Sequence, residues 1–186
     1  MHDLIAITAL GGTEPRIDSH GGVTCAESPG TALAFLAARS GREEEAQTAL
    51  AGLIGEEAPG VARMAGGELR AFWTGADQWM IEAPYRTHED IAATVKSAVG
   101  DAASVTEQTD GWVRFDLKGA GVLAVLELLC ILDTRRMQPG EASRTAIHHL
   151  ACFVLCQAPD RFTIYGPRAS AASLHHAILT AMRSAL

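Results

Sequence analysis

The stretch that decides the fold runs Phe72-Trp-Thr-Gly-Ala-Asp-Gln-Trp-Met-Ile-Glu-Ala-Pro84, and a second stretch, Leu155-Cys-Gln-Ala-Pro-Asp-Arg-Phe-Thr-Ile-Tyr-Gly-Pro167, repeats its pattern. The two align without a gap at an offset of 83 residues, the separation of Asp77 from Asp160. In each copy, apolar segments flank a short turn and the second segment stops at proline. This pattern predicts a β-hairpin in each copy.

An amphipathic segment follows each hairpin. At the same offset its apolar positions also coincide, with Ile91, Val95 and Val99 falling on Leu174, Ile178 and Met182. Their spacing of four residues predicts a helix in each copy. The shared order of hairpin, proline and helix favours an internal duplication over a chance similarity.

The other apolar segments extend this unit into two similar halves. Each half has the order strand, helix, strand, strand, helix, which is typical of the ferredoxin-like arrangement. We therefore predict an α+β fold of two ferredoxin-like βαββα(β) halves with antiparallel sheets, at residues 23–109 and 110–186, after a flexible N-terminal arm at 1–22. The predicted strands are 23–27, 33–37, 69–74, 78–83, 104–108, 112–117 and 145–157, followed by the second strand of the later hairpin, and the predicted helices are 43–54, 86–99, 119–132 and 170–186.

Composition excludes several classes of protein. A chain of 186 residues with 48% hydrophobic and 20% charged residues is typical of a globular protein. A net charge of −7 argues against nucleic acid as a partner, because phosphate binding needs a basic face. The apolar run at 119–132 is too short to cross a bilayer, and the N-terminus lacks the cationic start of a signal peptide. We expect a cytoplasmic protein with no membrane contact.

No motif in the sequence predicts a catalytic, cofactor-binding or metal site. Gly119-Ala-Gly121 lacks the third glycine and the lysine of phosphate loops, so we interpret it as a turn before a helix. His148 and His149 fall on a predicted strand and would point to opposite faces. The four cysteines have no zinc-type spacing and are expected to be reduced. Three of them lie inside apolar stretches and are interpreted as buried.

A few residues remain as candidates for binding. Trp73, Trp79 and Trp112 lie on or beside predicted strands, where they either pack in the core or form a stacking platform for a planar ligand. Asp133 lies in a charged loop. Arg144 opens a strand beside a loop, where a guanidinium could bind a carboxylate or stabilise a fold junction.

The stretch Trp73-Thr-Gly-Ala-Asp-Gln-Trp-Met-Ile81 resembles the W-x-G-P-D-E-W-L-L hairpin of the gamma subunit of heterotetrameric sarcosine oxidase. That family is similar to the folate-binding aminomethyltransferase fold of the glycine-cleavage T-protein. The resemblance covers about residues 23–186, with Ala76 in place of the usual proline and Ala169 interrupting an expected Arg-Ser pair. Its further motifs follow in the family's order: Thr109-Asp-Gly-Trp112, Leu128-Leu-Cys-Ile-Leu-Asp133, Arg144-Thr145 and Pro167-Arg-Ala-Ser170.

The resemblance implies a non-catalytic, structural subunit of a bacterial oxidoreductase complex. In that family sarcosine is oxidatively demethylated and tetrahydrofolate accepts the one-carbon unit. It further implies that FAD, FMN, NAD and tetrahydrofolate belong to the partner chains, here the alpha, beta and delta subunits. Family-motif or interface candidates are then Trp73, Asp77, Trp79, Trp112, Asp133, Arg144, Thr145 and Arg168.

The predicted helix at 119–132 is apolar almost all round. Such a helix needs cover from a core or from a partner, so we expect self-association or an exposed apolar patch when the chain is alone. Two alternatives stay open at this point: a free-standing folate- or pterin-binding protein of the same fold, and an uncomplexed scaffold.

Overall fold

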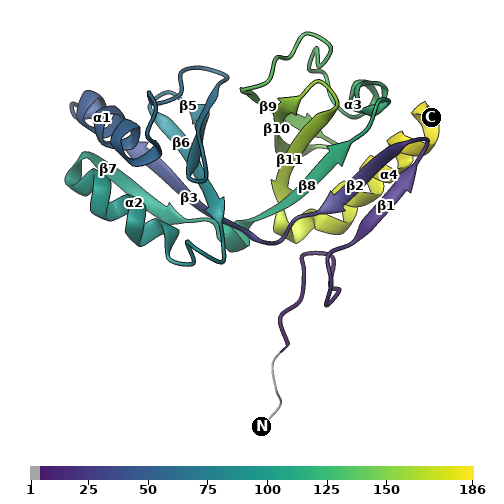
Figure 1. Ribbon diagram of the computed structural model, residues 1–186, viewed down its shortest axis with the longest axis horizontal. Helices are drawn as coiled ribbons and strands as arrows, with labels where there is room; N and C mark the ends of the chain where they lie inside the picture. Colours follow the sequence, from purple (N-terminus) through teal and green to yellow (C-terminus); the bar gives the residue numbers. More distant parts are fainter. Residues whose placement is uncertain (1–4) are drawn as a thin grey trace. The chain divides into compact units, whose positions relative to one another are not determined.

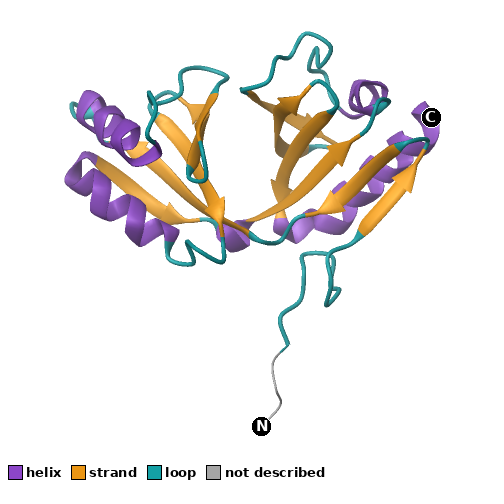
Figure 2. Ribbon diagram, in the orientation of Figure 1, coloured by secondary structure: helices purple, strands orange, loops and turns teal. Residues whose placement is uncertain are grey.

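The computed structural model describes residues 5–186, which form two compact units. One unit comprises Gly30–Asp110 with Gly140–Ser143, and the other comprises the described part of Met1–Pro29 with Gly111–Pro139 and Arg144–Leu186. In each unit, helices cover one face of a sheet (Figure 1 and Figure 2). None of the helices in residues 5–186 has the length and hydropathy needed to cross a membrane.

The unit built on Gly30–Asp110 has the predicted ferredoxin-like topology. Its five-stranded sheet has the order β4-β5-β6-β3-β7, and its strand pairs are antiparallel. Two helices pack on one face of the sheet. The elements are β3 (Thr31–Ala38), α1 (Glu43–Ile54), β4 (Met64–Gly66), β5 (Arg70–Gly75), β6 (Gln78–Pro84), α2 (Ile91–Val99), the short helix η1 (Gly100–Ala102) and β7 (Ala103–Glu107).

Helix α1 follows from local sequence signals. Three glutamates, Glu43–Glu45, occupy its first turn, where they stabilise the positive end of the helix dipole. Gly55 ends the helix in the left-handed region with φ of 74°. Between these ends, the buried residues Ala46 and Leu50 form the apolar stripe of the helix that packs on the sheet.

The second unit repeats this topology with one change in connectivity. Its six-stranded sheet has the order β1-β2-β8-β11-β10-β9, with helices on one face. The strand next to β8 is the N-terminal β2, whereas its counterpart in the other unit, β7, follows α2 along the chain. The elements are β1 (Ile17–His20), β2 (Val23–Glu27), β8 (Trp112–Lys118), α3 (Val122–Leu129), β9 (Glu141–Ile147), β10 (Leu150–Ala158), β11 (Arg161–Pro167), η3 (Arg168–Ser170) and α4 (Ala171–Ala185); η2 (Thr109–Gly111) lies where the units join in sequence.

The predicted domain boundaries are therefore wrong at the N-terminus. Residues 23–29 were expected in the first half, but β2 pairs antiparallel with β8 of the second, where Thr24 faces Lys118. This pairing joins residues far apart in sequence, which local patterns do not reveal. The other predicted boundary, between 109 and 110, lies within one residue of the observed one.

The two hairpins confirm the predicted register of the duplication. Trp73 pairs with Trp79 in β5–β6, and Cys156 pairs with Phe162 in β10–β11, at the offset of 83 residues already present in the sequence. Each hairpin then carries a register shift at the same place, between Trp73 and Gly75 and between Cys156 and Ala158. Trp79 and Phe162 are both buried in their respective cores, as predicted.

Two predicted elements of the second unit differ from the structure. The long strand at 145–157 is two strands, because His148 and His149 form a turn with φ of 46° and 66°. The two histidines are exposed turn residues and do not lie on a strand. The helix at 119–132 is confined to Val122–Leu129, because Cys130 adopts an extended conformation.

The N-terminal segment is anchored where the sequence suggested a flexible arm. Residues 17–20 form β1 and pair with β2. The buried Glu27 carboxylate accepts hydrogen bonds from the backbone N–H groups of Leu10 (3.0 Å) and Arg16 (3.2 Å). Since a buried carboxylate needs such donors, Glu27 ties the segment before β1 to the sheet. Residues 1–4 of the predicted arm lie outside the described residues.

Asp18 on β1 contacts Arg16 of the same segment and His175 on α4, and of these two contacts the one with His175 links β1 to the rest of the unit. Asp18 Oδ2 lies 2.9 Å from Arg16 Nε and 2.9 Å from His175 Nε2 on α4. The hydrogen bond from Arg16 holds the pKa of the Asp18 carboxyl below its usual value of 3.8. The stabilisation is present above that value and is lost as pH falls through the lower folded-state pKa.

We therefore expect β1 to loosen in acid. Limited proteolysis between pH 6 and pH 3, with an acid-active protease, should cut residues 8–20 increasingly fast below about pH 4. In Asp18→Asn the segment should already be sensitive at pH 6 and change less with pH. Equal pH profiles for the two proteins would show that Asp18 does not hold β1.

Candidate functional site

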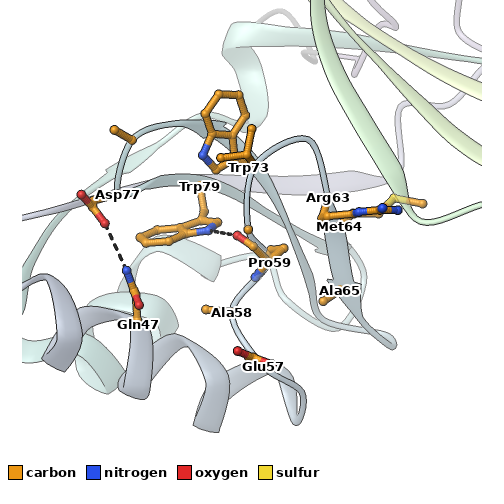
Figure 3. Close-up of a pocket in the computed structure, with 13 residues that line it drawn as sticks. Gln47, Glu57, Ala58, Pro59, Arg63, Met64, Ala65, Trp73, Asp77 and Trp79 are labelled. Atoms are coloured by element: carbon orange, nitrogen blue, oxygen red, sulfur yellow. Dashed lines mark hydrogen bonds between the residues drawn. The ribbon is translucent and has the colours of Figure 1, made fainter. Parts of the chain in front are cut away.

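A cavity of about 640 Å³ opens beside the first hairpin, within the unit built on Gly30–Asp110. Its size is typical of ligand pockets in proteins. Figure 3 shows its walls, which come from α1, the loop after α1, β4 and the β5–β6 hairpin. We call it the tryptophan pocket; its lining residues are Gln47, Glu57–Val61, Arg63–Ala65, Trp73, Ala76, Asp77 and Trp79.

The two tryptophans of the pocket have different environments. They are cross-strand partners, so their side chains lie on the same face of the sheet. Trp79 is 3% exposed, and its indole Nε1–H donates to the backbone oxygen of Pro59 at 2.8 Å (Figure 3). Trp73 is only half-buried. Both indoles line the cavity, but the loop after α1 covers Trp79 more fully than Trp73.

Polar groups at the edge of the tryptophan pocket are partly fixed by each other. Gln47 Nε2 on α1 donates to Asp77 Oδ1 at 3.1 Å, which joins the helix to the hairpin turn. Asp77 holds the left-handed turn conformation with φ of 53°, which Asp adopts more readily than most residues. Arg63 pairs with Glu141 at 3.1 Å, on a segment that bridges to residue 63.

The remaining predicted candidates do not join this pocket. In the second unit, Trp112 packs against Phe153 with ring centroids 5.3 Å apart, and Asp133 lies 4.0 Å from Arg136 in an exposed loop. Arg144 is exposed on β9. Its neighbour Thr145 has a buried hydroxyl without a hydrogen-bond partner in the described structure, and Arg168 Nη2 donates to the backbone oxygen of Ile7 at 3.4 Å.

A polar network on β8 was missed from the sequence. Asp116 accepts hydrogen bonds from Ser28 Oγ and Thr163 Oγ1, both at 2.6 Å, and from Arg114 Nε at 3.0 Å. Gln157 Nε2 donates in turn to Thr163 Oγ1 at 3.2 Å. Only the alternation of Arg114 and Asp116 with apolar residues was visible in sequence. A carboxylate that already accepts several hydrogen bonds is suited to joining strands rather than to accepting a proton from a substrate.

Burial disfavours the thiolate form of several cysteines, and residues 5–186 contain no metal cluster. All four cysteines are free, and burial raises the pKa of the Cys25 thiol to about 12 and that of Cys152 to about 11. Such thiols remain protonated at neutral pH and are poor nucleophiles. Among residues 5–186 no group of three or more His, Cys, Asp or Glu side chains is arranged to hold a metal ion.

Neither a protein-family model nor a curated protein sequence matches this chain. Several solved structures match it. A chain of the heterotetrameric sarcosine oxidase from Corynebacterium sp. U-96, solved with pyrrole 2-carboxylate, matches with a TM-score of 0.77 and 20% sequence identity over 90% of this chain and 87% of that one. This chain has the fold of that sarcosine oxidase chain.

A second solved structure places the fold in a wider context. Aminomethyltransferase T of the glycine cleavage system from Bartonella henselae matches with a TM-score of 0.60 and 14% identity, over 82% of this chain. The match spans 44% of the aminomethyltransferase chain, so it is confined to less than half of that protein. The two structures confirm the fold relationship that the motif order in the sequence suggested.

Proposed function

We propose that the chain is the gamma-type subunit of a heterotetrameric sarcosine oxidase complex and that it has a structural role. The observation that carries this proposal is the extent of the match to the Corynebacterium chain, which covers nearly all of both chains. A subunit of the same size and fold fits the same position in an assembly.

In this proposal the partners are the alpha, beta and delta subunits of a cytoplasmic complex. They hold FAD, FMN, NAD and tetrahydrofolate and carry out the oxidative demethylation of sarcosine. The present chain supplies a surface to which they bind. Without them, that surface is available for self-association.

Exposed apolar side chains after α3 support an interface there. Leu128, in the last turn of α3, is 59% exposed. Ile131, two residues after the helix ends, is 96% exposed. Large apolar side chains at such exposure are costly in water unless a partner covers them. The neighbouring Arg135 and Glu127 are joined by an ion pair and supply a polar rim of the kind found at interfaces.

Co-expression tests the proposal directly. The chain is produced with the alpha, beta and delta subunits from the same organism, and the mixture is analysed by size exclusion and by a sarcosine oxidation assay. We expect one complex that contains all four chains. If the three partners assemble and oxidise sarcosine normally while this chain elutes alone, the proposal is wrong.

Point variants locate the interface. Ile131→Asp should weaken the affinity for the partner subunits at least tenfold, because a desolvated charge would replace an apolar contact. A tenfold loss of affinity corresponds to roughly 1.4 kcal/mol of binding free energy. Thermal unfolding of the variant should be unchanged, since the side chain has almost no contacts within the chain. Tyr85→Asp, at a side chain that is 40% exposed in the other unit, is the control and should assemble normally.

The second candidate function is a free-standing folate- or pterin-binding protein. The fold shared with aminomethyltransferase T and the half-buried Trp73 at the wall of a cavity favour it. Titration of the isolated chain with tetrahydrofolate, followed by tryptophan fluorescence, distinguishes the two. Quenching that disappears in Trp73→Ala would support the binding protein over the structural subunit.

A further inference from the structure

The internal duplication provides a reference for the tryptophan pocket, because equivalent loops meet equivalent hairpins at different positions. In the second unit, Cys156 Sγ lies 3.9 Å from the backbone oxygen of Met137, in the loop at 130–140 that follows α3. In the unit built on Gly30–Asp110, the shorter loop at 55–63 follows α1 and accepts the hydrogen bond from Trp79 Nε1 at Pro59. At the offset of 83 residues, Cys156 corresponds to Trp73 and not to Trp79.

Met137 shows what covers this position when the loop reaches it. Its side chain is half-buried and packs against the core cluster that contains Cys156 and Phe162, and Cys156 is fully buried. The counterpart of Cys156, Trp73, is half-buried and lines the cavity of about 640 Å³. An unbranched apolar side chain from a loop therefore closes the position in one unit, and the same position remains open in the other.

The surface left open at Trp73 is apolar. Figure 3 shows the Trp79 indole next to Pro59 and the Trp73 indole apart from it. The Trp73 backbone N–H donates to the backbone oxygen of Arg63 at 2.9 Å, so the end of the loop that carries Val61 lies beside Trp73. Val61 also lines the cavity and is 72% exposed. A half-buried indole beside an exposed valine leaves apolar surface for another side chain to cover.

The polar groups of the pocket have partners or are hydrated. Gln47 is bonded to Asp77 at 3.1 Å, and Arg63 is paired with Glu141 at 3.1 Å. Glu57 is exposed to solvent. A polar ligand would lose its hydration and gain few new hydrogen bonds from these groups, whereas an apolar ligand loses only unfavourable contact with water. The pocket is therefore better suited to an apolar group than to a polar one.

We infer that the tryptophan pocket binds a methionine or leucine side chain that a partner subunit presents on a loop. This side chain covers Trp73 and Val61 from another chain, as Met137 covers Cys156 from within its own unit. Methionine suits the place because its unbranched chain adapts to irregular cavities and its sulfur makes favourable contacts with aromatic rings. The inference rests on the proposed function, since it assigns one contact between this chain and its partners.

An NMR titration of the isolated chain with two capped tripeptides tests the chemistry of the site. The peptides are Gly-Met-Gly and Gly-Gln-Gly, whose central side chains have similar length and differ in polarity. We expect the methionine peptide to shift the indole N–H resonance of Trp73 most and to leave that of Trp112, in the other unit, in place. The glutamine peptide should bind at least about fivefold more weakly, because its amide loses water without gaining a partner. Equal binding of the two peptides, or no binding of either, overturns the inference.

Matched variants assign the binding to the proposed residues. Trp73→Ala removes the indole from the wall and should weaken binding of the methionine peptide by about tenfold, whereas Trp73→Phe keeps an aromatic face and should retain most of it. Val61→Asp places a charge beside the apolar site and should weaken binding about fivefold. Trp112→Phe is the control and should bind as the parent does. Circular dichroism confirms that each variant is folded; a folded Trp73→Ala that binds unchanged contradicts the assignment.

The comparison with the second unit has a test of its own. Met137→Ala should lower the urea midpoint of that unit, because it uncovers the core around Cys156, whereas Met137→Leu fills the same space and should keep most of the stability. Amide hydrogen exchange distinguishes the two units. A Met137→Ala protein with an unchanged midpoint would show that this side chain does not close the position, and the choice of methionine or leucine as the ligand would then be wrong.

Co-expression with the alpha, beta and delta subunits identifies the source of the side chain. In the assembled complex the methionine peptide should no longer shift the Trp73 resonance, and Trp73→Ala should weaken the affinity for the partners about tenfold, whereas Tyr85→Asp, in the same unit and outside the pocket, should not. If Trp73→Ala assembles normally and the complex still binds the peptide, the inference is wrong and the subunit function stands.

Two other outcomes also overturn the assignment to a partner subunit. If the isolated chain self-associates and Trp73→Ala makes it monomeric, the side chain comes from a second copy of this chain. If no complex forms at all, the proposed function is wrong and the assignment to its subunits fails with it. The titration of the isolated chain then still decides whether the pocket selects an apolar side chain, so the two failures are distinguishable.

Discussion

Replacing Trp79 by alanine should lower the free energy of unfolding by about 3–5 kcal/mol, the range measured for large aromatic residues in protein cores. Trp79 is 3% exposed and belongs to the core cluster that the sheet and the helices of its unit form. The substitution leaves a cavity and also removes the donor to the backbone oxygen of Pro59, which is then without its partner in the interior. The loop after α1 loses its attachment to the hairpin at the same time.

Urea unfolding followed by circular dichroism measures this loss, and two variants show its origin. Trp79→Phe keeps most of the apolar volume and removes the N–H, so it should be destabilised by less, about 1–3 kcal/mol. Trp73→Ala removes a ring of the same size from a half-buried position and should cost less than Trp79→Ala. An unchanged urea midpoint for Trp79→Ala would show that Trp79 is not a core residue.

The second large effect is expected at Gly119, in the turn between β8 and α3. Its φ of 143° is strained for a residue with a side chain, and a Cβ there would lie 2.2 Å from the backbone oxygen of Gly22 and 2.9 Å from Val23 Cα. Both obstacles are backbone atoms of the β1–β2 turn and of β2, so they cannot rotate away. Gly119→Ala should therefore lower the free energy of unfolding by about 3–5 kcal/mol, from backbone strain and steric overlap together.

Gly52 is the matched control for this substitution. It lies inside α1, has no atom within 4 Å of the position of an added Cβ, and should gain about 0.5–1 kcal/mol as alanine because the unfolded chain loses freedom. Urea unfolding of both variants, with amide hydrogen exchange to separate the two units, compares them. A Gly119→Ala protein as stable as the parent would show that the β1–β2 turn moves to admit the methyl group.

The structure also explains why Gly119-Ala-Gly121 is not a phosphate loop. Gly119 is required by the approach of the β1–β2 turn. At Gly121 an added Cβ would lie 2.5 Å from Leu186 Cδ2, the end of a partly exposed side chain that can move away, so only the first glycine has a backbone cause. The prediction of a turn before a helix is confirmed, since α3 begins at Val122.

Local patterns predicted the hairpins and their helices because each is determined by residues close in sequence. The two hairpins, β5–β6 and β10–β11, follow from apolar segments on both sides of a short turn, and both signals are present in the sequence of each hairpin. The turn at His148 and His149, where both residues have positive φ, was missed because neither Gly nor Asn, the usual residues of two-residue hairpin turns, marks the position.

The tryptophan pocket could be predicted only in part. The sequence placed Trp73, Asp77 and Trp79 on one hairpin, and the structure brings all three to the cavity. It could not show that the loop from Glu57 to Arg63 covers Trp79 more fully than Trp73, because that depends on the path of an irregular segment. The network around Asp116 also joins strands from distant parts of the chain, and local patterns do not contain such contacts.

The position of the N-terminal strand β2 beside β8 has a consequence for synthesis on the ribosome. Strand β2 leaves the ribosome early, but its partner β8 follows roughly 90 residues later, as the pairing of Thr24 with Lys118 shows. All strands and both helices of the unit built on Gly30–Asp110 emerge in between. This unit can therefore fold while the nascent chain is still growing, whereas the edge of β2 that binds β8 stays open until β8 is made. The hairpin of β1 and β2 can form early, but it joins its own sheet only after a whole unit that is made later has emerged.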